Sequence, residues 1–585
     1  MPSQKKNTFY GAAAFLAMTT ILVKVIGALY KMPLAALLSE EAFADFNAAY
    51  NIYTVFLTFS TAGLPVALSK TVSECNALGR HNQKERVFRV ALAAFLVLGS
   101  ISFICMSLFS PIVAQYVLQN EKANFAVLAL SPAVLCTCCS AFRGYAQGHM
   151  NMVPTGVSQV IEALCKLLLG LALAVFVLHA ALPIDQDTRE RLSAAGALAG
   201  VSIGAILSLC YLIVNHIRTK RREHVTSADR PDRSRDILAQ LLRIAIPIAL
   251  SSCTLSIVNL IDTNLVQGQL QSVFTAIEGG LTDVSNSFMN IFPKAVEIFQ
   301  EKVAEYQAAV LLDPDTNVDP VLDAARNLYG TYGKTMSVYN LPFNLMVPLT
   351  ACIVPAVSAC IARRDRVGAG RTTESAMRMA ALIALPCGAG LFALGGPIVK
   401  VVTVGNVDTS IAGPLLSILG IASALVCIQT VATSILQANG IVNLPIVTMI
   451  VGGVSKIIVS YTLVGNPKFM VYGAPAGTLT CFAVVVVLNL LLIKRMVPHP
   501  PRYHRVFLKP LLASVIMGAA VWAAHGLLSD FLSGSFLLEA AVTALAILVG
   551  VVIYAVLVIV LGILSKSDLE MMPKGEKIAK ILHIR

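Results

Sequence analysis

Two lysines interrupt the first apolar run of the chain, ILVKVIGALYK, at positions 24 and 31. A charged side chain in the middle of a bilayer costs about 3 kcal/mol or more, so it usually has a function. Counted from a helix start near Phe9, Lys24 lies roughly 20 Å along the axis, which is close to mid-bilayer. Lys31 follows two helical turns later, so both ammonium groups share a face. This pattern predicts an anion-binding site, with a buried salt bridge as the alternative.

The seventh apolar run, ALSSCTLSIVNLIDTNLV, contains a second group of polar residues. Helical spacing places one polar stripe on a single face, and an acidic residue lies beside it: Ser252, Ser256, Asn259 and Thr263, then Asp262. We expect Asn259 to bind the substrate. For Asp262 two interpretations stay open, a counter-ion of Lys24 or a carboxylate that binds a coupling proton or cation.

The fifth apolar run contains an acid and a base four residues apart, Glu162 and Lys166. Side chains at this spacing are neighbours on a helix, which favours a local ion pair over contact with a substrate. We therefore assign both residues, like Asp262, to charge balance or ion coupling.

The helices that must position these residues follow from the composition. Of 585 residues, 56% are hydrophobic and 13% are charged, and the mean hydropathy is +0.75. Soluble domains carry about a quarter charged residues, so the composition indicates a polytopic membrane protein. Fourteen apolar runs are long enough to cross a hydrocarbon core of about 30 Å. The prediction is an all-α fold of about 14 transmembrane helices, the first of them retained because it lacks a signal-peptide cleavage pattern.

The distribution of basic residues predicts the orientation in the membrane. Loops on the side of the N-terminus hold 31 lysines and arginines, and the opposite loops hold nine. By the positive-inside rule, both termini lie in the cytoplasm. The basic residues of the cytoplasmic loops thus account for the net charge of +12. We therefore expect no nucleic-acid partner. The basic segment 217–240 is expected to be a solvated cytoplasmic linker, with contact to anionic lipid as the alternative.

Two pairs of matching positions indicate an internal repeat. YNIYTVFLTFSTAGLPVALS begins at Tyr50 and YNLPFNLMVPLTACIVPAVS at Tyr339, 289 residues later. Lys166 and Lys456 are 290 residues apart. This common offset indicates duplication of a six-helix unit. Two such units have the same orientation, so we expect a pseudo-two-fold axis along the membrane normal.

The repeat also predicts how the chain is divided. We expect a six-helix lobe at 1–216, the linker at 217–240, a second lobe at 241–500, and two extra helices with a basic cytoplasmic tail at 501–585. The second lobe contains an acidic, loop-like insertion at 268–335 on the external side. Two helical bodies with a site between them are typical of alternating-access transporters.

Motifs of catalysis and of metal binding are incomplete. Gly-Lys-Thr at 333–335 lacks the glycine that a phosphate loop needs four residues earlier. CTCC at 136–139 has no histidine or carboxylate at ligand spacing, so we expect packing cysteines and no metal site. A membrane-embedded glycosyltransferase would need paired catalytic carboxylates or histidines, and no such pair is found. We expect a protein that is not an enzyme and uses no cofactor.

Three segments resemble one family of membrane proteins. KVIGALYKMPLAALLS, AYNIYTVFLTFSTAGLPVALSKTVSE and FRGYAQGHMNMVPTGVSQVIEALCK resemble the stage V sporulation protein B group. That group belongs to the polysaccharide-exporter, lipid II flippase-like branch of the multidrug/oligosaccharidyl-lipid/polysaccharide flippase (MOP) superfamily. The resemblance implies fourteen helices, in two six-helix lobes plus two trailing helices. It also implies export of undecaprenyl-pyrophosphate-linked sugars.

The resemblance further implies roles for individual lysines. Lipid II flippases have an Arg-aliphatic-aliphatic-Gly pattern in the first helix that contributes to a cationic cavity, and KVIG at 24–27 matches it with lysine in place of arginine. Lys31 is close to a second cationic position of the family, and Lys334 corresponds to a third near the start of helix eight. We expect Lys24, Lys31 and Lys334 to bind the substrate, because an ammonium attracts pyrophosphate as a strong point charge.

The predicted function is a flippase in the bacterial cytoplasmic membrane that moves an undecaprenyl-pyrophosphate-linked glycan, lipid II above all, by alternating access. Its expected partners are this lipid-linked oligosaccharide, membrane lipid and an unidentified coupling ion. Two alternatives stay open, an exporter of another lipid-linked polysaccharide repeat unit and a cation-coupled multidrug exporter of the same fold. Exporters of cationic drugs need acidic cavities, whereas basic residues outnumber acidic ones in these spans.

Overall fold

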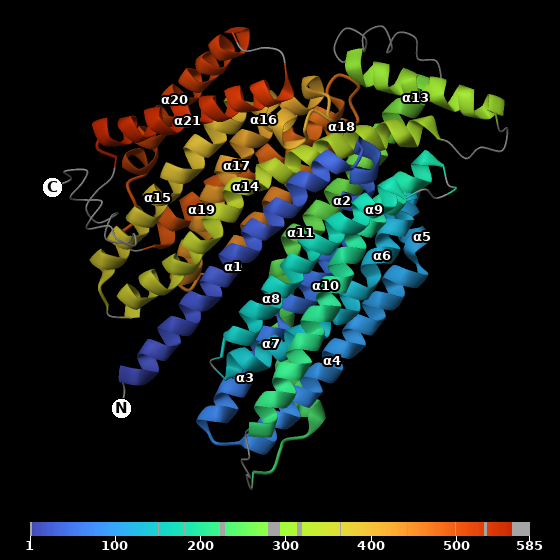
Figure 1. Cartoon of the computed structure of the whole chain (residues 1–585). Coiled ribbons are helices and arrows are strands. Elements are labelled where there is room, and N and C mark those ends of the chain that lie inside the picture. The colour runs from blue at the N-terminus through green and yellow to red at the C-terminus, as the bar shows by residue number, and fades with distance from the viewer. Residues whose placement is uncertain are drawn as a thin grey trace. The chain divides into compact units, whose positions relative to one another are not determined.

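The computed structural model describes residues 3–563 except 150, 181–182, 184, 223–228, 279–292, 313–318, 363, 442, 498 and 532–534. Within these residues the chain is helical and has no strand (Figure 1). It divides into two compact units, residues 1–268 and 269–585. Helix α11 (Ser234–Glu278) runs across the boundary and contributes to both units.

Eleven helices of the described part are long and apolar enough to cross a membrane. The chain is therefore a polytopic all-α membrane protein, as expected. The other three expected spans lie mainly on α2 (Glu40–Ala62), α11 and α14 (Pro320–Ala362). These helices carry buried polar side chains such as Asp45, Thr263 and Lys334. All three contribute residues to the sites considered below.

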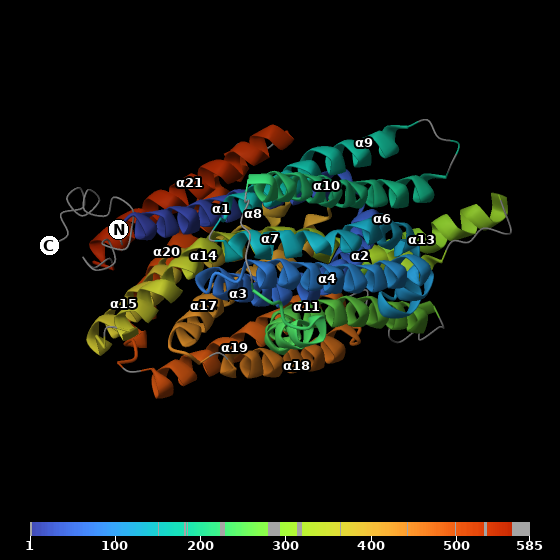
Figure 2. The same cartoon turned by 90° about the horizontal axis from the view of Figure 1, so that it is seen from below.

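The first unit is built around α10, which packs against α2, α6, α8 and α9 (Figure 2). Large apolar side chains of α1 and α2, among them Tyr30, Phe43 and Phe46, are fully buried in its core. Its elements are α1 (Ser3–Leu37), α2, α3 (Leu64–Ala77), α4 (His81–Leu108), α5 (Ser110–Ile112), η1 (Val113–Val117), η2 (Glu121–Ala123), α6 (Asn124–Leu135), η3 (Cys136–Cys138), α7 (Cys139–Gly148), α8 (Val153–Cys165), η4 (Lys166–Gly170), α9 (Leu171–His179), α10 (Gln186–Arg222) and the larger part of α11.

Glycines on one face of α10 let this helix approach its neighbours closely. Gly196, Gly200 and Gly204 repeat every four residues. A β-carbon at Gly200 would lie 2.3 Å from the Cα atom of Gly170. Small residues at this spacing allow close contact of helix backbones in membrane proteins. The stripe thereby holds α10 against the turn that carries Lys166.

The substitution Gly200→Ala is expected to lower the unfolding temperature, because the added methyl group would overlap the backbone of Gly170. Overpacking of this kind costs about 1–3 kcal/mol. Gly390→Ala is the matched control, since a β-carbon there meets nothing within 4 Å and alanine is the better helix former. Thermal unfolding in detergent compares the two variants. Equal unfolding temperatures would mean that α10 does not depend on this close approach.

The second unit is built around α17, which packs against α14, α15 and α19. The hydroxyl of Ser423 in α17 donates a 3.0 Å hydrogen bond to the carbonyl oxygen of Tyr339 in α14. Its elements are the end of α11, α13 (Pro293–Leu312), α14, α15 (Arg366–Ala393), α16 (Gly395–Val402), α17 (Thr409–Ala438), α18 (Leu444–Val464), η5 (Met470–Tyr472), α19 (Gly473–Met496), α20 (Tyr503–Phe531) and α21 (Phe536–Val560).

Within the segment 268–335, the described residues are almost all helical, so the prediction of a loop-like insertion is wrong for them. α11 continues to Glu278, α13 occupies Pro293–Leu312, and α14 begins at Pro320. Acidic residues suggested a solvated loop, but α13 also consists mostly of good helix formers such as Ala, Glu, Gln and Lys.

The linker and the tail are described in part. Asp229, between α10 and α11, accepts hydrogen bonds from the backbone N–H groups of Asn82 (3.0 Å) and Gln83 (2.9 Å), and so caps the first turn of α4. Residues 223–228 of the linker and 564–585 of the basic tail lie outside the described residues.

Helix boundaries follow the offset of the predicted repeat. α7 ends at Gly148 and α17 at Ala438, 290 residues later. α8 begins at Val153 and α18 at Leu444, and each has a proline in its first turn. The spacing between Lys166 and Lys456 is thus shared by the helices around them.

Candidate functional site

Three lysines and two tyrosines of the first unit lie together, Lys24, Lys31, Lys166, Tyr30 and Tyr50; we name them the lysine–tyrosine cluster. The Nζ atom of Lys166 lies 4.8 Å and 4.4 Å from the ring centroids of Tyr30 and Tyr50, and it donates a 3.1 Å hydrogen bond to the Tyr50 hydroxyl. The Nζ atom of Lys31 lies 5.2 Å from the centroid of the Tyr50 ring. Lys24 lies on α1 seven residues before Lys31, about two helical turns earlier and on the same face.

The cluster lacks a carboxylate. In the described part of the chain, none of its three ammonium groups has an acidic oxygen within 4 Å. All three lysines are half-buried, and repulsion between like charges is stronger there than in bulk water. Contacts with the tyrosine rings offset part of this repulsion, at about 0.5–2 kcal/mol each. An anion between the lysines would offset it further, so the arrangement suits anion binding.

Two helices and one π-helical turn position the cluster. α1 carries three of its residues, α2 carries Tyr50, and the π-helical turn η4 begins with Lys166. Tyr30 is fully buried, and its hydroxyl donates a 3.0 Å hydrogen bond to the carbonyl oxygen of Ala197 in α10. The π-helical turn is itself informative, because such turns are rare and occur frequently at functional sites.

Glu162 and Lys166 have different partners, so the predicted pair between them is wrong. Glu162 accepts a 2.9 Å hydrogen bond from the guanidinium of Arg143. Arg143 also donates to the hydroxyls of Ser158 (2.9 Å) and Ser208 (3.1 Å), and so links α7, α8 and α10. A planar guanidinium matches a carboxylate better than a flexible ammonium does. Lys166 contacts Tyr30 and Tyr50 instead, and its positive charge adds to the cluster.

The polar stripe of α11 faces α2. The Nδ2 atom of Asn51 donates a 2.9 Å hydrogen bond to the hydroxyl of Thr263. The hydroxyls of Thr58 and Ser256 lie 3.2 Å apart. The side chain of Ser252, the first residue of the stripe, lies outside the described residues. The stripe thus binds one helix to another at two of its four positions.

Asn259 and Asp262 lie on the same part of α11, the first half-buried and the second buried. Lys24 has no ion pair among the described residues, so Asp262 is not its counter-ion in this structure. The remaining interpretation of Asp262 is a carboxylate that binds a coupling proton or cation.

Lys334 belongs to the second unit and lies inside α14, where it is 1% exposed. The prediction placed it near the start of its helix, but α14 begins fourteen residues earlier, at Pro320. Asp319 explains this early start, because its carboxylate accepts hydrogen bonds from the N–H groups of Val321 (3.0 Å) and Leu322 (3.2 Å). A buried lysine in a membrane helix remains a candidate functional residue.

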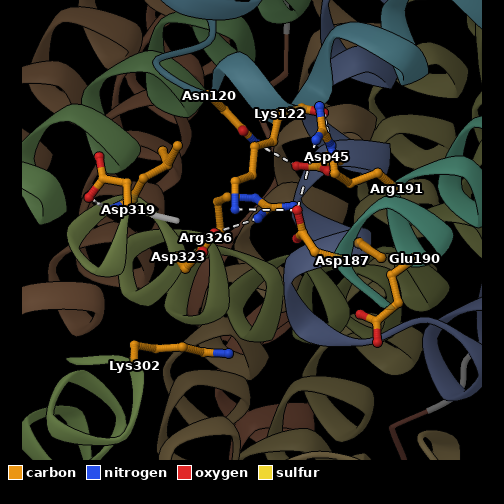
Figure 3. A network of polar contacts seen from close by, with 12 residues as sticks. Asp45, Asn120, Lys122, Asp187, Glu190, Arg191, Lys302, Asp319, Asp323 and Arg326 are labelled. Carbon is orange, nitrogen blue, oxygen red and sulfur yellow. Dashed lines mark hydrogen bonds and ion pairs between the residues drawn. The ribbon is translucent and has the colours of Figure 1, made fainter. Parts of the chain in front are cut away.

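A second polar network of the first unit joins α2, η2 and α10 (Figure 3). The Nδ2 atom of Asn120 donates a 2.7 Å hydrogen bond to Asp45. The ammonium of Lys122 lies 3.4 Å from a carboxylate oxygen of Asp187, and Arg191 lies 3.8 Å from the same oxygen. Each of these cations faces a carboxylate, so the network stabilises the fold locally and differs in this respect from the lysine–tyrosine cluster.

Tyr30, Tyr50, Asn51 and Arg143 were not among the predicted site residues. Tyr50 and Asn51 open the repeated segment, so the repeat marked their positions without showing their role. Arg143 is a charged residue inside an apolar run, which is the signal that singled out Lys24. Tyr30 carried no signal of its own in the sequence.

Two family models match successive parts of the chain. The model described as "Polysaccharide biosynthesis protein" matches residues 11–293, and "Lipid II flippase MurJ" matches residues 329–566. The chain is 22% identical over 574 residues to stage V sporulation protein B of Bacillus subtilis (strain 168), with 97% of this chain and 98% of the relative covered. It is 22% identical over 578 residues to lipid II flippase MurJ of the same organism, with 94% and 95% covered.

Solved membrane proteins have a similar fold. A structure of lipid II flippase MurJ in an inward closed conformation matches with a TM-score of 0.64 at 15% identity, covering 94% of this chain and 98% of that one. An inward-facing MATE-family multidrug resistance transporter of the MOP superfamily matches with a TM-score of 0.57 at 12% identity, covering 82% and 98%. The likeness is one of fold, that of polytopic all-α transporters.

Proposed function

We propose that this chain, which is similar along nearly its whole length to stage V sporulation protein B and to lipid II flippase MurJ of Bacillus subtilis, moves a lipid-linked glycan across a membrane. Its substrate is an undecaprenyl-pyrophosphate-linked sugar. Lipid II is the substrate that we favour, because one family model and one relative carry that name. The protein acts in the bacterial cytoplasmic membrane by alternating access, with both termini in the cytoplasm.

The observation that carries this proposal is the gathering of three lysines without a carboxylate. Pyrophosphate is the part of such a substrate that carries a fixed, concentrated negative charge, and an ammonium binds phosphate oxygens by charge-assisted hydrogen bonds. The Lys166 ammonium lies over the ring faces of Tyr30 and Tyr50, which position it. The apolar lipid tail needs no site in the cluster, because it can stay in the surrounding hydrocarbon.

Other residues have proposed roles in the same transport cycle. Lys334 and Asn259 are proposed as further substrate contacts. Each is a polar residue inside a helix that is expected to span the membrane, α14 for Lys334 and α11 for Asn259. Asp262 is proposed to bind the coupling proton or cation, because it is a buried carboxylate in a helix expected to span the membrane, and such residues usually have a function. Translocation breaks no covalent bond, so the proposal requires a transporter and no enzyme activity.

Two alternatives differ in their support. Another lipid-linked polysaccharide repeat unit would present the same pyrophosphate, so the cluster suits it equally well. A cation-coupled multidrug exporter is supported by the fold of the MATE-family neighbour alone. Three half-buried ammonium groups would repel a cationic drug, which makes this the weaker alternative.

In a bacterium depleted of its own lipid II flippase, the wild-type chain is expected to restore growth, and Lys24→Ala is expected to fail at equal amounts in the membrane. Lys220→Ala is the matched control, because Lys220 pairs with Glu85 at an exposed position outside the cluster. Growth with Lys24→Ala would remove Lys24 from the binding site. Absence of growth with well-expressed wild-type protein would remove lipid II as the substrate and favour another lipid-linked glycan.

A further inference from the structure

A groove of the first unit lies between α4 and the first turns of α11, and no residue of the lysine–tyrosine cluster lines it. Its volume is about 880 Å³. One end is basic and the walls are apolar, with Arg86, Arg89 and Arg235 at that end and Val90, Val97, Ile101, Leu238 and Leu242 among the wall residues. A groove with this division of charge matches an amphipathic ligand whose head is negative.

The three arginines are available to such a ligand. Arg89 and Arg235 are exposed and have no ion pair among the described residues. The guanidinium of Arg86 donates a 3.1 Å hydrogen bond to the hydroxyl of Ser234 and has no carboxylate partner in the same part of the chain. This bond joins α4 to the first residue of α11 and holds the basic end of the groove together.

Acidic residues near the groove have other partners or lie off its surface. Asp232 lies 3.3 Å from the guanidinium of Arg80, and Glu85 lies 3.1 Å from the ammonium of Lys220. Asp236 follows Arg235 in α11 but does not line the groove. The charge of the groove's basic end is therefore positive overall.

The apolar wall has the length of one acyl chain in one leaflet. Val90 and Ile101 are eleven residues apart, which is about 16 Å along a helix. One leaflet accounts for half of a hydrocarbon core of about 30 Å. Val97 and Ile101 are 60% and 54% exposed, so the wall is open to lipid.

We propose that this groove binds one anionic phospholipid, with its phosphate among Arg86, Arg89 and Arg235 and one acyl chain along the apolar wall. A guanidinium suits the headgroup because it binds phosphate oxygens in pairs. Basic pockets between membrane helices bind anionic lipids in this way. The bound lipid braces α4 against the start of α11. This site is independent of what the protein transports.

The test is native mass spectrometry of the purified full chain with equal amounts of dioleoyl-phosphatidylglycerol and dioleoyl-phosphatidylcholine. The wild type is expected to retain phosphatidylglycerol about tenfold over phosphatidylcholine, and the triple variant R86Q/R89Q/R235Q is expected to lose this preference. The matched control R366Q/R371Q/R495Q removes the same charge from exposed arginines outside the groove and is expected to keep it. An equal loss in both triple variants, or in neither, would overturn the proposal.

A second variant tests the acyl-chain part of the site. Ala93 is an exposed wall residue, so Ala93→Phe is expected to fold and to fill the groove while all three arginines remain. Retention of phosphatidylglycerol is expected to fall about tenfold. Unchanged retention would reduce the site to a surface attraction for the headgroup. If equimolar undecaprenyl phosphate displaces phosphatidylglycerol, the ligand of the groove is the transported lipid and not a phospholipid. Either result would contradict the proposal.

Discussion

Replacement of Lys166 by methionine is expected to lower the rate of substrate translocation at least tenfold. Methionine keeps much of the side-chain volume but removes the ammonium, which lies 3.1 Å from the Tyr50 hydroxyl and over two tyrosine rings. A hydrogen bond to a charged group contributes about 1.5–3 kcal/mol, and about 1.4 kcal/mol corresponds to a factor of ten. The measurement is the initial rate at which labelled lipid II crosses the membrane of proteoliposomes that contain the full chain.

Two further variants separate the contributions to this site. Lys166→Arg keeps the charge and can still stack on tyrosine, so it is expected to retain most of the rate. Tyr50→Phe keeps the ring and removes only the hydroxyl, and a loss of a few-fold is expected. A Lys166→Met variant that translocates at the wild-type rate would exclude its ammonium from substrate binding. A loss shared equally by Lys166→Arg would point to packing and not to charge.

Replacement of Arg143 by methionine is expected to destabilise the first unit by about 1–3 kcal/mol, because the half-buried carboxylate of Glu162 loses its charged hydrogen-bond partner. The side chains of Arg143 and Glu162 are 14% and 29% exposed, and their ion pair measures 2.9 Å. The hydroxyls of Ser158 and Ser208 lose a donor in the same variant. Thermal unfolding of the purified chain in detergent measures the effect.

A double-variant cycle distinguishes a direct ion pair from general damage to the core. Arg143→Met/Glu162→Gln removes both charges, so it is expected to recover part of the stability that Arg143→Met loses. Lys70→Met is the matched control, because it breaks an exposed ion pair of 4.0 Å with Glu74 and is expected to cost less than about 1 kcal/mol. Strictly additive effects of the Arg143 and Glu162 substitutions on the unfolding temperature would contradict direct coupling.

The fold and the family resemblance could be predicted from the sequence because both depend on local, one-dimensional signals. Long apolar runs determine which segments cross a membrane, and KVIG at 24–27 carries the family pattern. The family models and relatives confirm that resemblance. The acidic composition of 268–335 led to the wrong prediction of a loop. Within this segment, α13 is a helix that consists mostly of helix-forming residues.

The candidate site could be predicted only in part. Lys24 and Lys31 stood out because charge inside an apolar run is visible without a structure. Lys166 was assigned a local partner because spacing along one helix is all that a sequence shows directly. Its actual neighbours, Tyr30 and Tyr50, come from two other helices, and only tertiary packing brings them within reach.

Because of the π-helical turn at Lys166–Gly170, the number of residues in this membrane span affects where the Lys166 side chain lies. Such a turn contains one residue more than an α-helical path needs, whereas α18 around the repeat partner Lys456 is α-helical throughout. Each residue of an α-helix advances by about 100°. Insertion or deletion of a single residue here would therefore swing the Lys166 ammonium around the helix axis, which no substitution can do. In a relative, the insertion or deletion of one residue in this turn would therefore place the cation at the position of Lys166 inside the cluster or outside it.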